Sequence, residues 1–119
     1  MSGRFPHAVF GTGDEPDPRF SLANERTFLA WNRTALALIA GGVALESLGL
    51  DLQQGFRLAA SLVLVGTGTL TPVLSWMEWM HAERALREGS PLPGAHQGVV
   101  LATAVASVGV LLILAVLLR

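Results

Sequence analysis

Two long stretches of the chain contain no ionisable side chain, and they dominate its hydrophobic pattern. One lies between Arg57 and Glu78, and the other lies between His96 and Arg119. Each would form a helix about 30 Å long, which is roughly the thickness of the hydrocarbon core of a bilayer. Two buried helices of this kind in a soluble protein would need a core that the rest of so short a chain does not supply. We therefore predict two transmembrane spans, at about 57–78 and 97–118.

A third apolar segment is interrupted by charge. The uncharged run between Arg33 and Glu46 would make only about 18 Å of helix, which is too short to cross a bilayer core. Extending the span back to residue 27 supplies the missing length and carries Arg33 about 10 Å below the interface. We predict this span at about 27–48, in a helix that begins at Pro18 after Asp17 as its N-cap. Residues 1–17 lack periodicity and are predicted to form a flexible tail.

Composition and charge agree with a membrane protein of one domain. Of the 119 residues, 51% are hydrophobic and only 14% are charged, and the mean hydropathy is +0.51. Most of the arginines precede the first span or lie between the second and third, so the positive-inside rule places the N-terminus in the cytoplasm and the C-terminus outside. The predicted fold is all-α, with a three-helix domain at 18–119 in the inner (plasma) membrane. Its first two helices extend into the cytoplasm.

Arginines recur every seven residues on the predicted first helix, at Arg19, Arg26 and Arg33, and they therefore share one helical face. Small residues continue this face into the membrane: Ala37, Ala40, Gly41 and Ala44. An arginine inside a membrane seldom faces lipid, so we expect Arg33 to face protein, water or an anionic partner. If several copies surrounded one axis with this face inward, their arginines would form positive rings, as in pores selective for anions and phosphate.

A second interpretation of the arginines needs no pore. Arg19 and Arg26 would bind anionic headgroups, and Arg33 would extend its long side chain back to the interface. This interpretation explains the charges and leaves their seven-residue spacing to chance. A conduit requires the arginines to face a hydrated lumen. A non-conducting scaffold or assembly subunit would instead bury the small residues against partners and leave no continuous path.

The first helix also carries a long motif, Asn-Glu-Arg-Thr-Phe-Leu-Ala-Trp at residues 24–31, followed by Arg33 and Thr34. This motif resembles the opening signature of the YidH-like inner-membrane proteins, a domain of unknown function with three spans. The same module is similar to the transmembrane part of the eukaryotic vacuolar transporter chaperone complex, which synthesises polyphosphate and moves it across a membrane.

The resemblance to the eukaryotic complex implies an assembly and a substrate. In that complex five modules surround a pore lined by basic residues of the first helix, so the resemblance implies a homopentamer with Arg19 and Arg26 at basic pore positions. Arg33 departs from the eukaryotic pattern and fits the bacterial one. Because these 119 residues contain no polymerase or phosphate-sensing domain, the resemblance does not imply polyphosphate synthesis.

Other polar and small residues are predicted to hold helices together. We expect Glu25 to pair with an arginine of a neighbouring subunit or of the second helix, and Asn32 to pack against another helix. Gly66 and Gly68 should allow close packing of the second span. Glu78 and His81 have the Glu-x-x-His spacing of di-iron bundles, but such a site needs further carboxylates.

These patterns favour a membrane subunit over an enzyme. The chain has no cysteine and no recognisable catalytic constellation, so we expect no enzymatic activity, no cofactor and no metal. The expected partners are the lipid bilayer and further copies of the chain, with an inorganic anion or polyphosphate as a possible ligand, and no nucleic acid. The leading hypothesis is an anion or phosphate-polymer conduit, and the alternative is a non-conducting scaffold.

Overall fold

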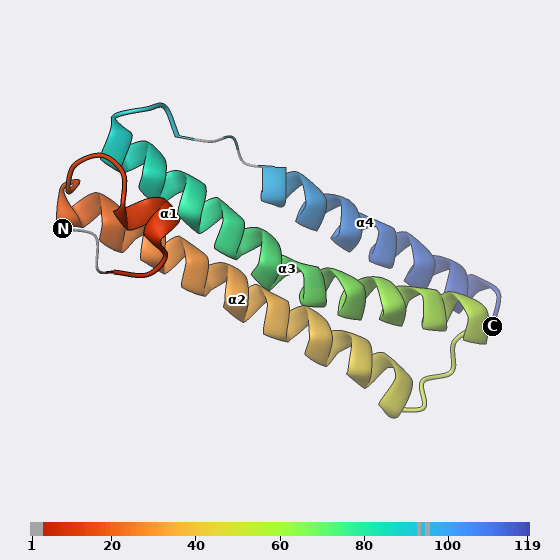
Figure 1. Cartoon of the computed structure of the whole chain (residues 1–119). Helices are drawn as coiled ribbons and strands as arrows, with labels where there is room; N and C mark the ends of the chain where they lie inside the picture. Colours follow the sequence, from red (N-terminus) through yellow and green to blue (C-terminus); the bar gives the residue numbers. More distant parts are fainter. Residues whose placement is uncertain (1–3, 93, 95) are drawn as a thin grey trace.

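Three long antiparallel helices form the body of the protein in a computed structural model that describes residues 4–92, 94 and 96–119. They are α2 (Pro18–Ser47), α3 (Gln54–Glu88) and α4 (His96–Leu117), and a short helix, α1 (His7–Phe10), precedes them (Figure 1). The described residues contain no strand, and all three long helices are long and apolar enough to cross a membrane. The predicted all-α fold with three candidate membrane helices is confirmed.

Local sequence explains where α2 begins and where α3 ends. The Asp17 carboxylate accepts a hydrogen bond from the backbone N–H of Arg19, and Pro18 occupies the first helical position, as predicted. Helix α3 ends at Gly89. This glycine adopts a left-handed conformation with φ of 68°, which a residue with a Cβ adopts only with strain. Asp17 and Pro18 therefore mark the start of α2, and Gly89 marks the end of α3.

Helix α3 lies in the middle of the layer, with α2 on one side and α4 on the other (Figure 1). Among the described residues, the backbones of α2 and α4 do not approach each other closely. Where α2 meets α3, the Ser61 hydroxyl donates to the carbonyl oxygen of Gly42 at 2.6 Å. Because α4 presents mostly exposed apolar side chains, its outer surface suits contact with lipid.

The register of α4 against α3 is fixed at both ends. The Gln97 side-chain amide donates to the carbonyl oxygen of Thr71 at 3.1 Å, and the backbone N–H of Gln53 donates to the carbonyl oxygen of Ala115 at 2.9 Å. With a length of about 33 Å, α4 just matches a bilayer core, whereas α2 and α3, at about 45 and 52 Å, exceed it. The excess projects at one end, where α2 begins and α3 ends, which we term the arginine-rich end.

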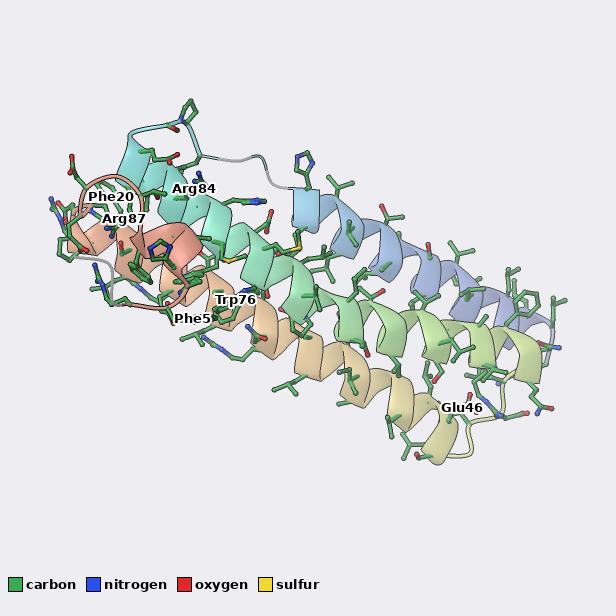
Figure 2. All side chains as sticks on the ribbon, in the orientation of Figure 1. Phe5, Phe20, Glu46, Trp76, Arg84 and Arg87 are labelled. Atoms are coloured by element: carbon green, nitrogen blue, oxygen red, sulfur yellow. The ribbon has the colours of Figure 1, made fainter. Side chains whose placement is uncertain are left out.

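The segment before α2 lies against α3 at the arginine-rich end. Val9 is only 1% exposed there, the Phe10 ring lies 6.3 Å from the Trp79 ring, and Phe5 stacks on Trp76 (Figure 2). The sequence predicts a flexible tail over residues 1–17 because their pattern has no helical period. In the structure, the described part of this segment includes α1 and packs through individual aromatic and apolar side chains, a mode of packing that periodicity does not reveal.

Candidate functional site

The three arginines of α2 lie on the face of the helix that is turned away from α3. Arg19, Arg26 and Arg33 are all exposed, as are Ala37 and Ala40 farther along the same face. We term these five residues the arginine face. The opposite face of α2 packs on α3 through a second seven-residue pattern: Ser21, Phe28, Ala35 and Gly42, with Asn24, Trp31, Leu38 and Leu45 between them. The arginine face is therefore open to lipid, water or another subunit.

Arg19 is paired within its own chain. Its guanidinium donates to the Asp17 carboxylate at 2.8 and 3.2 Å, and both side chains are reachable by solvent. The side-chain hydrogen bond from Arg19, followed by the hydrogen bond from its backbone N–H, lowers the pKa of Asp17 below its ordinary value of 3.8. Among the described residues, Arg26 and Arg33 take part in no ion pair, so their charges are available to an external anion.

The contacts of α3 with α2 and α4 place Arg33 level with the start of α4. Gly68 of α3 faces Ala35 and Ile39 of α2, and the Gln97 side chain at the start of α4 bonds to Thr71 of α3. Since neighbouring helices are antiparallel, these contacts place Arg33 level with the first turn of α4. If α4 spans the hydrocarbon core, this register places Arg33 near the interface instead of at the predicted depth of about 10 Å below it. That prediction came from fitting α2 alone to the bilayer, whereas its register against α4 sets the depth.

Among the small residues named from the sequence, only Gly68 is buried between α2 and α3, whereas Gly66, Gly41 and Ala44 are exposed or partly buried. Gly68 is buried, and a Cβ there would come within 2.7 Å of Ile39 Cγ1 and 2.8 Å of the Ala35 carbonyl oxygen, so it permits close approach of α2 and α3. Gly66 is exposed, and a Cβ there would meet nothing within 4 Å. Gly41 and Ala44 are partly buried at the edge of the helix pair. The arginine face therefore keeps its small side chains free of contacts with α3.

Among the described residues, Glu25 and Asn32 form no ion pair or side-chain hydrogen bond to another helix. Glu25 is exposed, and within the described residues it forms no ion pair. The Asn32 amide donates to the carbonyl oxygen of Phe28 at 2.9 Å, one turn back in its own helix. Pairing of either side chain with a neighbouring subunit stays a prediction.

A polar cluster between α2 and α3 was missed by sequence reasoning. Glu83 of α3 is only 3% exposed, and its carboxylate accepts hydrogen bonds from the Ser21 hydroxyl at 3.1 Å and from the Asn24 amide at 3.3 Å. Asn24 also donates to the carbonyl oxygen of Trp79 at 3.1 Å. The available signal was the position of Ser21 and Asn24 on the α2 face that packs on α3. The cluster fixes the register of the two helices near the arginine-rich end.

Arg87 ties the N-terminal segment to α3 (Figure 2). Its side chain is 5% exposed and donates to the carbonyl oxygen of Thr12 at 2.8 Å and to the Glu15 carboxylate at 3.0 Å. The guanidinium also lies 5.3 Å from the centre of the Phe10 ring. The sequence does not indicate this role for Arg87, because its partners lie more than 70 residues away along the chain. Arg87 is a buried anchor and not a free positive charge.

Comparison with known proteins places these features in a family. The pattern of a domain of unknown function (DUF202) matches residues 19–85, which include the arginine face and the polar cluster. The chain belongs to this family. No solved structure matches the chain significantly.

Two relatives are similar over most of their length. An uncharacterized protein of Mycobacterium tuberculosis is 49% identical over 83 residues, covering 69% of this chain and 68% of the relative. The inner membrane protein YidH of Escherichia coli K12 is 45% identical over 83 residues, covering 68% of this chain and 71% of YidH. With three apolar helices and this kinship, the chain is a multi-pass inner membrane protein.

Proposed function

We propose that several copies of the chain assemble around an axis with their arginine faces inward and form a conduit for anions, including inorganic phosphate or polyphosphate. One observation carries this proposal: Arg26 and Arg33 are exposed and, within the described residues, unpaired, on the side of α2 opposite to α3. A second copy can approach that side without displacing any helix of the first. By resemblance to the vacuolar transporter chaperone complex, the assembly has five copies.

The level of the arginines determines what they do in such a conduit. Arg19, Arg26 and Arg33 rise over about 21 Å of helix, and the deepest of them is level with the first turn of α4. Their rings therefore form a positive vestibule at one mouth instead of a filter at the centre of the membrane. A vestibule of this kind raises the local concentration of anions and rejects cations.

Below the vestibule, the arginine face offers only small side chains to the proposed lumen. Ala37 and Ala40 are exposed, and neither brings a charge or a large side chain that would close the path. Short side chains also allow neighbouring α2 helices to approach closely. The same surface would serve the alternative, a non-conducting scaffold, if copies packed so tightly that no water remained between them. Conduction itself therefore separates the two functions.

The test is anion flux into proteoliposomes that hold the purified oligomer. Arg26→Ala and Arg33→Ala remove charges from the vestibule, and Arg84→Ala is the matched control, because Arg84 is an exposed arginine of α3 that pairs with Glu88 outside the arginine face. We expect chloride or phosphate flux to fall in the first two variants and to be unchanged in the control. Wild-type liposomes as impermeable as empty ones to chloride, phosphate and short polyphosphate would leave the scaffold as the function.

A further inference from the structure

A cavity of about 330 Å³ lies at the arginine-rich end, between α2, α3 and the start of α4. Its wall includes three aromatic side chains, those of Phe28, Trp31 and Trp79. Glu78 of α3 is the one charged residue among those that line it, and none of the arginines of α2 reaches it. The cavity is therefore chemically distinct from the arginine face, on the other side of α2.

The aromatic wall is held in place by contacts from behind. The Trp76 ring lies 6.0 Å from the Phe28 ring in an edge-on arrangement and stacks at 5.1 Å on Trp79. The Asn24 amide also holds the backbone of Trp79 through its carbonyl oxygen. Since the Phe28 and Trp79 rings pack on Trp76, this part of the cavity wall needs little rearrangement to accept a ligand.

The Glu78 carboxylate lacks a partner in the part of the chain that the structure describes. It takes part in no ion pair or hydrogen bond there, while Arg84 and Arg87, the arginines of the same helical segment, are paired with Glu88 and Glu15. A partly buried carboxylate beside aromatic rings is stabilised by a cation, and aromatic faces attract ammonium groups in the same way. Carboxylate and rings together select a positively charged group.

The location of the cavity indicates where this cation comes from. Thr71 is level with the start of α4, and Glu78 lies about 10 Å farther along α3, within the headgroup layer if α4 spans the hydrocarbon core. Because the backbones of α2 and α4 stay apart, a lipid can approach the cavity sideways between them. Leu92 and Gly98 border the cavity on the α4 side and leave that approach without a charged barrier.

We propose that this cavity binds the ammonium headgroup of a phospholipid such as phosphatidylethanolamine, with Glu78 pairing with the ammonium and Phe28, Trp31 and Trp79 enclosing it. The bound lipid would fill the gap between α2 and α4 at the membrane surface. This binding does not depend on conduction, so it can hold whether or not the protein is a conduit.

Native mass spectrometry tests the proposal directly. The purified protein in detergent is offered equal amounts of phosphatidylethanolamine and phosphatidylglycerol with matched acyl chains, and the lipid retained by each variant is counted. We expect the wild type to prefer phosphatidylethanolamine and Glu78→Gln to weaken that binding about tenfold, the usual effect of losing one charge-assisted contact. Glu88→Gln, on the same helix and outside the cavity, is the matched control and should behave as wild type.

Two further variants keep the test decisive. Glu78→Lys should reverse the preference toward phosphatidylglycerol, and Trp31→Leu, which keeps an apolar wall and removes an aromatic ring, should lower retention of phosphatidylethanolamine. A wild type without preference, or a Glu78→Gln protein that keeps it, would overturn the proposal. Displacement of the lipid by an equal concentration of water-soluble glycerophosphoethanolamine would overturn the assignment to a lipid. Unfolding midpoints of all variants establish that each is folded.

Discussion

Removing the Glu83 carboxylate tests the polar cluster that joins α2 to α3. Glu83→Ala takes away the acceptor for the Ser21 hydroxyl and the Asn24 amide, whose bonds to it measure 3.1 and 3.3 Å. Hydrogen bonds to a charged partner contribute about 1.5 kcal/mol or more each, so we expect a loss of about 3 kcal/mol in the free energy of unfolding. Asn24 retains its bond to the Trp79 carbonyl oxygen, which keeps the loss from being larger.

Reversible unfolding of the protein in mixed micelles, followed by circular dichroism, measures this loss. Glu88→Ala is the matched control: Glu88 is also on α3 but pairs with Arg84 at the surface, and removal of such a pair costs less than about 1 kcal/mol. Glu83→Gln keeps one acceptor oxygen, so its free energy of unfolding should lie about midway between those of the wild type and Glu83→Ala. If Glu83→Ala and Glu88→Ala proved equally stable, the cluster would not hold the two helices together, and the reasoning from its burial and geometry would be refuted.

Three further predictions concern the helix contacts, the cap of α2 and the N-terminal segment. Gly68→Ala should lower the unfolding midpoint in micelles because its Cβ would collide with α2, whereas Gly66→Ala, which meets nothing, should be neutral or stabilising; equal effects would contradict the packing. Asp17→Asn should lower the unfolding midpoint at neutral pH, and its difference from wild type should vanish well below pH 3.8. Because the pKa of Asp17 is lowered in the folded protein, the carboxylate stabilises the fold fully above pH 3.8. This stabilisation is lost only as the pH falls through the lowered pKa. Arg87→Gln should release the segment before α2, so limited proteolysis should cut before Asp17 several times faster than in wild type. Equal cleavage rates in the variant and the wild type would contradict this role of Arg87.

The architecture could be predicted from the sequence because its signals are local. The long uncharged runs predict the number of membrane helices, and the Asp17–Pro18 pair predicts where α2 begins, because a capping side chain acts within two or three residues of its own position. These features need no knowledge of the contacts between helices.

The site could be predicted only in part because it depends on register. The seven-residue spacing of the arginines predicts that they share one face, and they do. Small residues, however, occur on both faces of α2: Ala35 and Gly42 pack on α3, while Ala37 and Ala40 face outward. Composition does not distinguish these faces. The level of Arg33 relative to α4 depends on contacts of α3 with both neighbours, at Gly68 and at Thr71, which no pattern on α2 contains.

The level of the arginines also constrains the energetics of the proposed assembly. Because Arg33 is level with the start of α4, its guanidinium can remain hydrated in one copy or in several, so burial of charge does not oppose assembly. Repulsion between the arginines of neighbouring copies would oppose the proposed assembly wherever their guanidiniums come within the screening length, which is about 8 Å at physiological salt. The offset must come from close packing of the small residues deeper on the arginine face and from anions bound at the mouth. Under the proposed function, a polyanion that bridges several arginines would bind the assembled form more tightly than the single chain, and by linkage it would stabilise the oligomer that conducts it.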